Sequence, residues 1–419
     1  MPAQQAQPTG PTRPARAPWG LAGPFWWLWG GTLVTSAGGF VVPFMAIYLT
    51  TVRGYSVFFT GLTLTTFGVG SGIASLFGGI LADRVGRRTV LLASEVLTVT
   101  GMLGLGLAHG RAPVLLFTLT VGVGLNATRP ARAAAVADLV APEDLPRAYA
   151  LIYWATNLGF SVAAVTAGLA ASHGFLLLFL VNALANLLAG VMVYLRVPET
   201  RPPPDPGRAA GTAGTARTAH RTPGFPVLLG SVLLLGLIFQ QPLVALPLAM
   251  TADGLSAADY GAAMMMNGLV IAVLQLPLTR LAGRLRPEHA LAAATLVTGL
   301  GLGLTAAVHG TAGYGASVVV WSLGEIVVWP TCMALVAALS PPGREGGYQG
   351  WFLSTWSVSV ALAPVLSGRV IEASGTATVW GACLCLAMAC AGCHLLLARL
   401  RADHRTEAVP GGQETVTHP

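Results

Sequence analysis

The amino-acid sequence predicts an all-α membrane protein with twelve transmembrane helices in two bundles of six. Only 9% of the 419 residues are charged, whereas a soluble domain carries about 25%. A chain this poor in charge cannot cover a water-facing surface, so it requires lipid as its solvent. Apolar stretches of about 20 residues, the length that crosses a bilayer, recur along the chain. A polar, proline-rich segment separates them into two sets of six.

The first half begins with a tail of residues 1–25, in which Arg13 and Arg16 precede the first apolar run. No small-residue cleavage site followed by a polar mature domain is present, so we expect a cytoplasmic tail before a retained helix. The first bundle covers residues 26–196. Its helices are expected at residues 26–50, 57–82, 89–109, 113–136, 148–172 and 175–196.

A linker of residues 197–225 separates the two bundles. It contains Pro202-Pro203-Pro204, a low-complexity run, and almost no large apolar side chains. Such a segment cannot bury enough surface to fold, so we expect a disordered cytoplasmic linker. The second bundle covers residues 226–400 and precedes a cytoplasmic tail, residues 401–419. Its helices are expected at residues 226–250, 257–282, 289–309, 313–338, 348–373 and 376–400.

The positions of the arginines predict the orientation, because cytoplasmic loops of membrane proteins are enriched in positive charge. The chain has no lysine. With the N-terminus in the cytoplasm, 18 arginines lie on that side and only Arg53, Arg111 and Arg369 lie outside. We therefore expect a multi-pass protein of the cell membrane with both termini in the cytoplasm. The arginines follow one membrane face and form no patch with interleaved aromatics, which argues against a nucleic-acid partner.

The loop after the second helix carries a specific pattern, Gly79-Ile80-Leu81-Ala82-Asp83-Arg84-Val85-Gly86-Arg87-Arg88. It resembles the signature loop of the major facilitator superfamily, at the expected place between helices two and three. The resemblance implies a secondary transporter with the major facilitator fold. It also implies that the aspartate caps the start of helix eleven, here near residues 348–351, when the transporter faces outward. The gating residues implied are Gly79, Asp83, Arg84, Gly86, Arg87 and Arg88.

Other segments resemble the drug:proton antiporters of this superfamily, with two departures. Residues 278–284 repeat the loop in the second half without its aspartate, and helices four and ten end in similar sequences. However, Ala163-Ala164 replaces a Gly-Pro element that is associated with antiport, and Thr118 stands near the place of an expected arginine. The departures weaken the prediction of export and leave import open.

Charged groups inside the predicted helices are functional candidates, because a charge at the bilayer centre costs about 2.5–3.5 kcal/mol on insertion scales. Glu325 lies near the middle of helix ten and is our first proton-coupling candidate. Glu95 is the second, about 9 Å into helix three at 1.5 Å per residue. Arg129 and Arg132 of helix four lie at similar depth and could pair with Glu95, in a structural role as readily as in coupling.

Polar and aromatic side chains inside the helices could contact a substrate. Each amide among them could equally join two helices by a hydrogen bond. Gln240 and Gln241 stand out because Pro242 interrupts helix seven directly after them. The candidates are Asn126, Tyr153, Trp154, Asn157, Gln240, Gln241, Trp321 and Trp356.

The leading hypothesis is a proton-coupled exporter of small amphipathic molecules or drugs. Without lysine no nucleotide-binding loop can form, and we find no nucleophile and base pair, so we predict neither an enzyme nor an ATP-driven pump. Cys390 to His394 match a haem-attachment pattern inside the last apolar run, where packing is the simpler explanation. We expect no cofactor and no metal, a monomer, and as partners a small-molecule substrate, protons and the bilayer. The alternatives are an importer of a sugar or other metabolite and a non-transporting sensor or scaffold.

Overall fold

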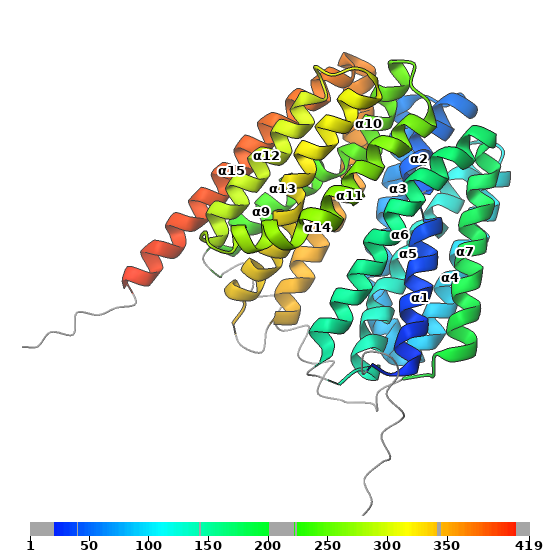
Figure 1. Ribbon diagram of the computed structural model, residues 1–419, viewed down its shortest axis with the longest axis horizontal. Helices are drawn as coiled ribbons and strands as arrows, with labels where there is room; N and C mark the ends of the chain where they lie inside the picture. Colours follow the sequence, from blue (N-terminus) through cyan, green and yellow to red (C-terminus); the bar gives the residue numbers. More distant parts are fainter. Residues whose placement is uncertain are drawn as a thin grey trace, which may run out of the picture.

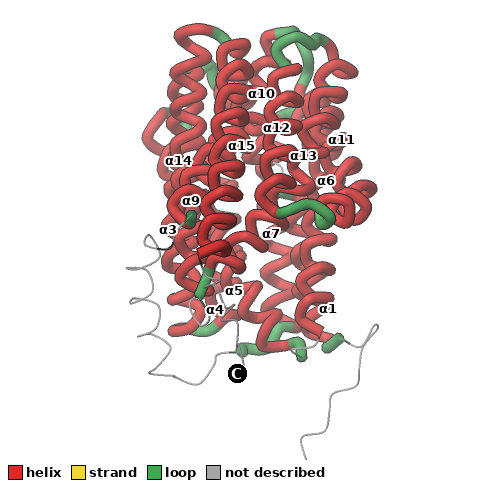
Figure 2. Tube along the Cα trace, turned by 90° about the vertical axis from the view of Figure 1, so that its left-hand side faces the viewer, coloured by secondary structure: helices red, strands yellow, loops and turns green. Residues whose placement is uncertain are grey.

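The computed structural model describes residues 21–39, 41–141, 144–200, 222, 224–341 and 345–407, and these residues form long helices joined by short turns (Figure 2). The first half contains α1 (Gly23–Gly38), α2 (Val41–Ile47), the π-helix η2 (Tyr48–Val52), α3 (Val57–Val85), α4 (Arg87–Leu107), α5 (Arg111–Leu139), α6 (Leu145–His173) and α7 (Phe175–Arg196). The second half contains α9 (Phe225–Phe239), α10 (Gln241–Ala252), α11 (Ala257–Ala282), α12 (Pro287–Leu304), α13 (Gly310–Leu339), α14 (Glu345–Ser374) and α15 (Thr376–Glu407).

Eleven segments in the described part of the chain are long and apolar enough to cross a membrane. Helices α1, α2 and η2 together form the first of them, and α9 with α10 forms the seventh. Helix α12 is not among these eleven segments, because it is short and starts with the polar turn Pro287-Glu288-His289. It is the ninth helix in chain order and brings the total to twelve. It packs between α13 and α15 as α4 packs between α5 and α7. The all-α fold with six helices in each half is therefore confirmed.

The two halves repeat one another with an offset of 200 positions. Gly124 of α5 lies against α4, where an added Cβ would stand 2.8 Å from the backbone nitrogen of Thr98. Gly324 of α13 lies against α12 in the same way, 2.8 Å from the backbone nitrogen of Thr298. Both glycines are needed because the helix backbones touch. This close packing at matching positions indicates two parallel structural repeats.

The halves meet near one end of the helices. We call this the distal end, where α3 begins at Val57 and α14 ends at Ser374; the proximal end is where α1 begins at Gly23. A Cβ on Gly61 of α3 would stand 2.4 Å from the carbonyl oxygen of Pro364 in α14. In Figure 1 the ribbons of the two halves lie together near α2 and α10 and diverge toward the proximal end.

The apolar core follows the same division. One cluster of buried side chains at the distal end takes members from both halves, and the rings of Phe44 and Tyr260 meet there at 5.1 Å. Two further clusters lie in the proximal part, one inside each half. Among the described residues, the core that the halves share therefore lies at the distal end, and each half has its own core at the proximal end.

Two expected boundaries are wrong by several residues. Residues 197–200 were expected in the disordered linker, but Val197 is buried and Glu199 binds the start of α4. Helix α15 continues past residue 400 into the expected tail, because Arg401 pairs with Glu288 at the start of α12. The other expected linker residues, 201–221 and 223, lie outside the described residues, as do 1–20 and 408–419.

Candidate functional site

The loop between α3 and α4 makes a sharp turn at Gly86. Its φ of 108° is a value that residues with a side chain rarely adopt. A Cβ at this position would also stand 2.4 Å from the carboxyl group of Glu199. Both observations require glycine here, as the sequence pattern predicts.

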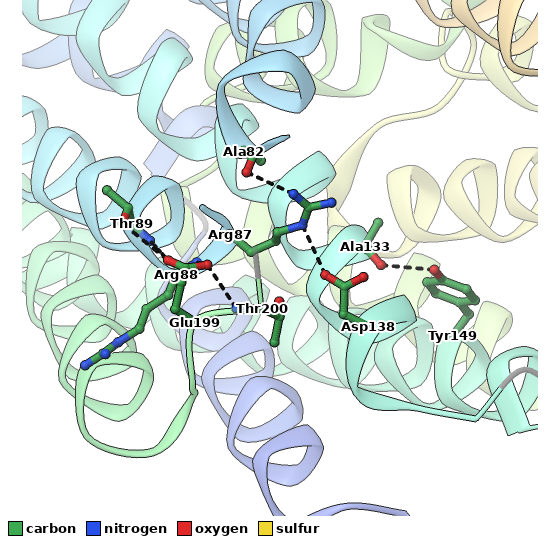
Figure 3. Close-up of polar contacts among 9 residues, drawn as sticks. All are labelled: Ala82, Arg87, Arg88, Thr89, Ala133, Asp138, Tyr149, Glu199 and Thr200. Carbon is green, nitrogen blue, oxygen red and sulfur yellow. Dashed lines mark hydrogen bonds and ion pairs between the residues drawn. The ribbon is translucent and has the colours of Figure 1, made fainter. Parts of the chain in front are cut away.

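Arg87 holds the ends of three helices together at this turn (Figure 3). Its Nε lies 3.1 Å from Asp138 Oδ2 at the end of α5, and its guanidinium donates to the carbonyl of Ala82 in α3. Arg87 is buried, and a buried guanidinium needs such partners. Asp138 is not among the residues expected from the sequence to form the gate, although this acidic residue follows an apolar stretch directly.

Glu199 caps the start of α4. Its carboxylate accepts hydrogen bonds from the backbone N–H groups of Arg88 and Thr89 at 3.3 and 3.2 Å (Figure 3). The first N–H groups of a helix have no partner within the helix, so a carboxylate there is favourable. Arg88 donates to the carbonyl of Tyr194 and lies over its ring, which ties the end of α7 to the same corner.

Three residues of the expected gating set remain without a described interaction. Arg84 is exposed at the end of α3. Gly79 and Asp83 belong to α3, but their side-chain environment lies outside the described part. The expected partner of Asp83, the start of α14, lies at the proximal end of the other half, where Tyr348 packs on Phe225 at 4.5 Å. The gating role of Asp83 stays a prediction.

Glu325 lies at the middle of α13 and is partly exposed. Asn267 of α11 donates a hydrogen bond to Glu325 Oε2 at 2.7 Å. The same amide nitrogen lies 2.9 Å from Ser322 Oγ. An amide donor from a neighbouring helix therefore holds a carboxyl group half-way along a membrane-spanning helix.

Glu95 lies in a different setting, inside the first half. It is 4% exposed and packs beside Gly190 of α7. Arg132 of α5 is its electrostatic partner, while Glu95 Oε2 accepts no hydrogen bond from the described residues. Arg129 is exposed, in contrast to Glu95. The structure therefore places Glu95 and Arg132 together and leaves Arg129 outside that contact.

Two of the aromatic candidates lie in clusters with exposed ring surface. Trp154 of α6 is 54% exposed and stacks on Trp29 of α1 at 6.3 Å. Trp356 of α14 meets Trp329 of α13 edge-to-face at 5.1 Å. Trp321 is different, because it is 3% exposed in the shared distal core. Its backbone also packs against Gly301, so Trp321 serves helix packing.

The polar candidates also divide by their contacts. Gln241 is buried and accepts a hydrogen bond from Ser367 of α14 at 2.8 Å, which joins two helices. Asn126 is buried and donates within α5 to the Gly122 carbonyl. Gln240 at the break between α9 and α10 and Asn157 are partly exposed, and Tyr153 is exposed. These last three remain candidates for substrate contact.

The distal end carries further contacts that the sequence did not reveal. Glu372 of α14 accepts a hydrogen bond from the backbone N–H of Phe58 in α3 at 2.6 Å, and Arg369 lies 4.0 Å over the Phe58 ring. Within the second half, His309 and Tyr314 donate to Asp253 between α10 and α11. Their hydrogen bonds hold the pKa of the Asp253 carboxyl below its usual value.

The thiol and imidazole of the haem-attachment pattern lie inside the second half. Cys390 Sγ is 3.4 Å from His394 Nε2, and the thiol donates to the carbonyl of Ser231 in α9. Both side chains are buried. Among the described residues, no group of three or more His, Cys, Asp or Glu side chains could hold a metal ion.

Comparison with known proteins places this arrangement in a family. The model of the Major Facilitator Superfamily matches residues 28–319 and 228–418. The MFS-type transporter YttB of Bacillus subtilis, itself uncharacterized, is 26% identical and covers 82% of this chain and 86% of its own length. A Na(+), Li(+), K(+)/H(+) antiporter of Planococcus maritimus is 24% identical, over 78% of this chain and 84% of its own. The multidrug resistance protein MdtH of Aeromonas hydrophila is 25% identical, over 78% and 82%.

Solved structures show the same fold. A POT family transporter in complex with 5-aminolevulinic acid aligns with a TM-score of 0.77 at 15% identity. The alignment covers 93% of this chain and 98% of the other.

Proposed function

Because the chain belongs to the Major Facilitator Superfamily and is a multi-pass membrane transporter, we propose that it exports small amphipathic molecules in exchange for protons. The carboxyl group of Glu325 supports the proposal most directly. It lies half-way along α13, partly exposed, with a hydrogen bond from Asn267. A membrane protein retains an ionisable group at this depth at a cost, and proton relays are a common reason.

The proximal end faces the cytoplasm in this proposal. Most arginines outside the spanning segments lie at that end, in accordance with the positive-inside rule. The halves then touch at the external end and diverge toward the cytoplasm, as an inward-facing state requires. A reporter inserted near Gly211, which lies outside the described residues, tests the orientation: cytoplasmic activity is expected, and external activity would reverse it.

The turn between α3 and α4 acts as the cytoplasmic gate in this proposal. Arg87 and Asp138 fix the ends of α4 and α5 to each other at 3.1 Å, so this corner moves as one body. Asp83, at the end of α3, is then carried toward the start of α14 when the proximal end closes. A carboxylate at a helix start stabilises that state by about 0.3–1 kcal/mol.

The relatives support export and coupling to different degrees. A multidrug resistance protein and a cation/proton antiporter are both similar to this chain over more than three quarters of its length. One feature favours the alternative of import: Ala163-Ala164 stands where the antiport-associated Gly-Pro is expected. The carbonyl of Ala164 instead packs against Gly261 of α11.

The deciding experiment uses everted membrane vesicles with an internal acid load and a pH-sensitive dye. Addition of a substrate should release protons through the wild-type protein and leave the pH unchanged with Glu325→Gln. Substrate movement at a rate that does not depend on the pH gradient would show that the protein is a facilitator and not a proton-coupled exporter. A screen in which no amphipathic compound moves would count against this substrate class.

A further inference from the structure

Arg129 projects from α5 between the contacts that this helix makes with its neighbours. Nearby, α3 packs through Gly78 on Ala127 and Pro130, and α4 carries Glu95 beside Arg132. Arg129 lies between these two contact faces and is exposed. It is ten residues from the proximal end of α5, hence about 15 Å into the helix.

Arg129 has no acidic partner in the described part of the chain. The described ion pairs of Arg87 with Asp138, His309 with Asp253, and Arg401 with Glu288 do not involve Arg129. Glu95, which the sequence offers as a partner for either arginine, interacts with Arg132 instead. Glu95 is thus engaged by Arg132, and Arg129 adds a positive charge at this level with no counter-charge among the described residues. An unpaired guanidinium inside a membrane span is costly, so its retention points to a ligand.

The exposed ring of Trp154 in α6 lies at nearly the same height along the helices as Arg129 in α5. Tyr149 of α6 donates a hydrogen bond to the carbonyl of Ala133 in α5, which fixes the level of one helix against the other (Figure 3). From that bond toward the distal end, Arg129 is one turn along α5, about 6 Å. Trp154 is about 7.5 Å along α6 by the same rise per residue.

Trp154 also lies on the side of α6 that faces the second half. Ser161 and Gly168 of α6 contact α11 across the halves, and Trp154 precedes them by seven and fourteen residues, which places it on nearly the same face. The α6 contacts with α11 lie in the distal part, whereas Trp154 is 54% exposed in the proximal part.

The second half presents an aromatic side chain at the equivalent place. With the offset of 200 positions, Trp329 of α13 corresponds to Arg129 of α5, and each is ten residues from the proximal end of its helix. Trp329 is partly exposed and meets Trp356 at 5.1 Å. A cation in one half and an aromatic ring in the other thus occupy matching positions.

We propose that the transported molecules are aromatic anions: Arg129 binds their carboxylate or sulfonate, and Trp154 and Trp329 pack against their rings. This inference rests on the proposed transport function. Guanidinium groups favour such anions because two N–H groups can bind one oxyanion in parallel. Tryptophan supplies a large apolar face that stacks on a ring.

The test measures binding to the purified full-length protein with three probes that share one ring system: naphthoate, naphthamide and naphthylmethylammonium. Naphthoate should bind at least about tenfold more tightly than the neutral amide, and the ammonium more weakly than either. Arg129→Gln should bring naphthoate to the affinity of the amide, while Arg129→Lys retains part of the preference. Arg280→Gln, which changes an exposed arginine at the end of α11, is the matched control and should leave all three affinities unchanged.

Equal binding of the three probes by the wild-type protein would overturn the inference without any variant. An anion preference that survives in a folded Arg129→Gln or Arg129→Lys protein at wild-type strength would overturn it as well. Neither result would affect the proposed proton coupling, which the dye experiment measures separately. Conversely, anion-selective binding without pH-driven transport would overturn the coupling and keep the anion site.

Discussion

The amide of Asn267 donates a hydrogen bond to the Glu325 carboxyl group at 2.7 Å and thereby joins α11 to the middle of α13. Helix α11 is also the helix that meets α6 of the first half, through Gly261 and Gly268. A change in the contact between the halves therefore has a short route to Glu325, through one helix and one side chain. Such a route could link the protonation of Glu325 to the rearrangement of the halves.

Glu325→Gln should abolish transport driven by a pH gradient and preserve substrate binding. Glutamine mimics the protonated carboxyl group in shape and can still accept the hydrogen bond from Asn267. It cannot release a proton, so a cycle that requires release stops. The measurement compares uptake into everted vesicles with equilibrium binding to the purified protein.

Glu95→Gln is the matched control, because Glu95 is an acidic residue within the first half. If Glu325→Gln still builds a pH-driven substrate gradient at the wild-type rate, the proton site lies elsewhere. Loss of that gradient in Glu95→Gln would then identify Glu95 as the site.

The two acidic residues near Arg87 should behave differently. Asp138→Asn removes the charge that pairs with the buried Arg87 and should lower stability by about 1–3 kcal/mol. Asp83→Asn should leave stability and insertion unchanged but reduce turnover, because it removes the proposed lock. Thermal unfolding of the purified variants and transport rates separate the two effects. Wild-type turnover of a folded Asp83→Asn protein would count against gating.

The contacts of Asp253 predict a stability effect at low pH. The hydrogen bonds from His309 and Tyr314 depress its pKa in the folded protein. A depressed pKa adds stability that is complete above the unfolded value, about 3.9, and is lost as the pH falls through the folded value. The wild-type protein should therefore lose its advantage over Asp253→Asn only below about pH 4. Melting temperatures of both proteins from pH 3 to 7 test this. If the wild-type advantage in melting temperature already shrank as the pH fell from 7 to 5, the result would contradict the prediction.

Features with a local cause were predictable from the sequence. Apolar length gives the helices, and Gly86 with its flanking residues gives the turn between α3 and α4. Partners from distant parts of the chain were not predictable: Glu199 binds Arg88 and Thr89 from a polar, proline-rich segment that gives no sign of packing.

The direction in which each side chain faces could not be predicted from the sequence either, and the reason is physical. A helix in lipid is apolar on all sides, so its periodicity does not reveal which face meets a neighbour. Trp321 and Trp329 are two turns apart on α13, yet one is 3% exposed in the distal core and the other is partly exposed beside Trp356. The backbone contact of Trp321 with Gly301 of α12 separates their roles.

Gly68→Leu should shift the protein away from the arrangement in which the halves touch at the distal end. A Cβ on Gly68 would stand 2.7 Å from the Cα atom of Ala361 in α14, so a larger side chain forces the two helices apart. Overpacking of this kind costs about 1–3 kcal/mol, which corresponds to a population shift of about fivefold to about 140-fold. Each half keeps its own proximal core, so the variant should still insert and fold.

Hydrogen exchange of the distal parts of α3 and α14 measures the shift. Exchange should become faster there in Gly68→Leu, and transport should slow because one state of the cycle is disfavoured. Gly381→Leu in α15 is the control, since a Cβ at that position meets nothing within 4 Å. Unchanged exchange and transport in Gly68→Leu would mean that the contact between Gly68 and Ala361 does not limit the cycle. Equal effects in both variants would point to a general cost of leucine in these helices and away from the contact between the halves.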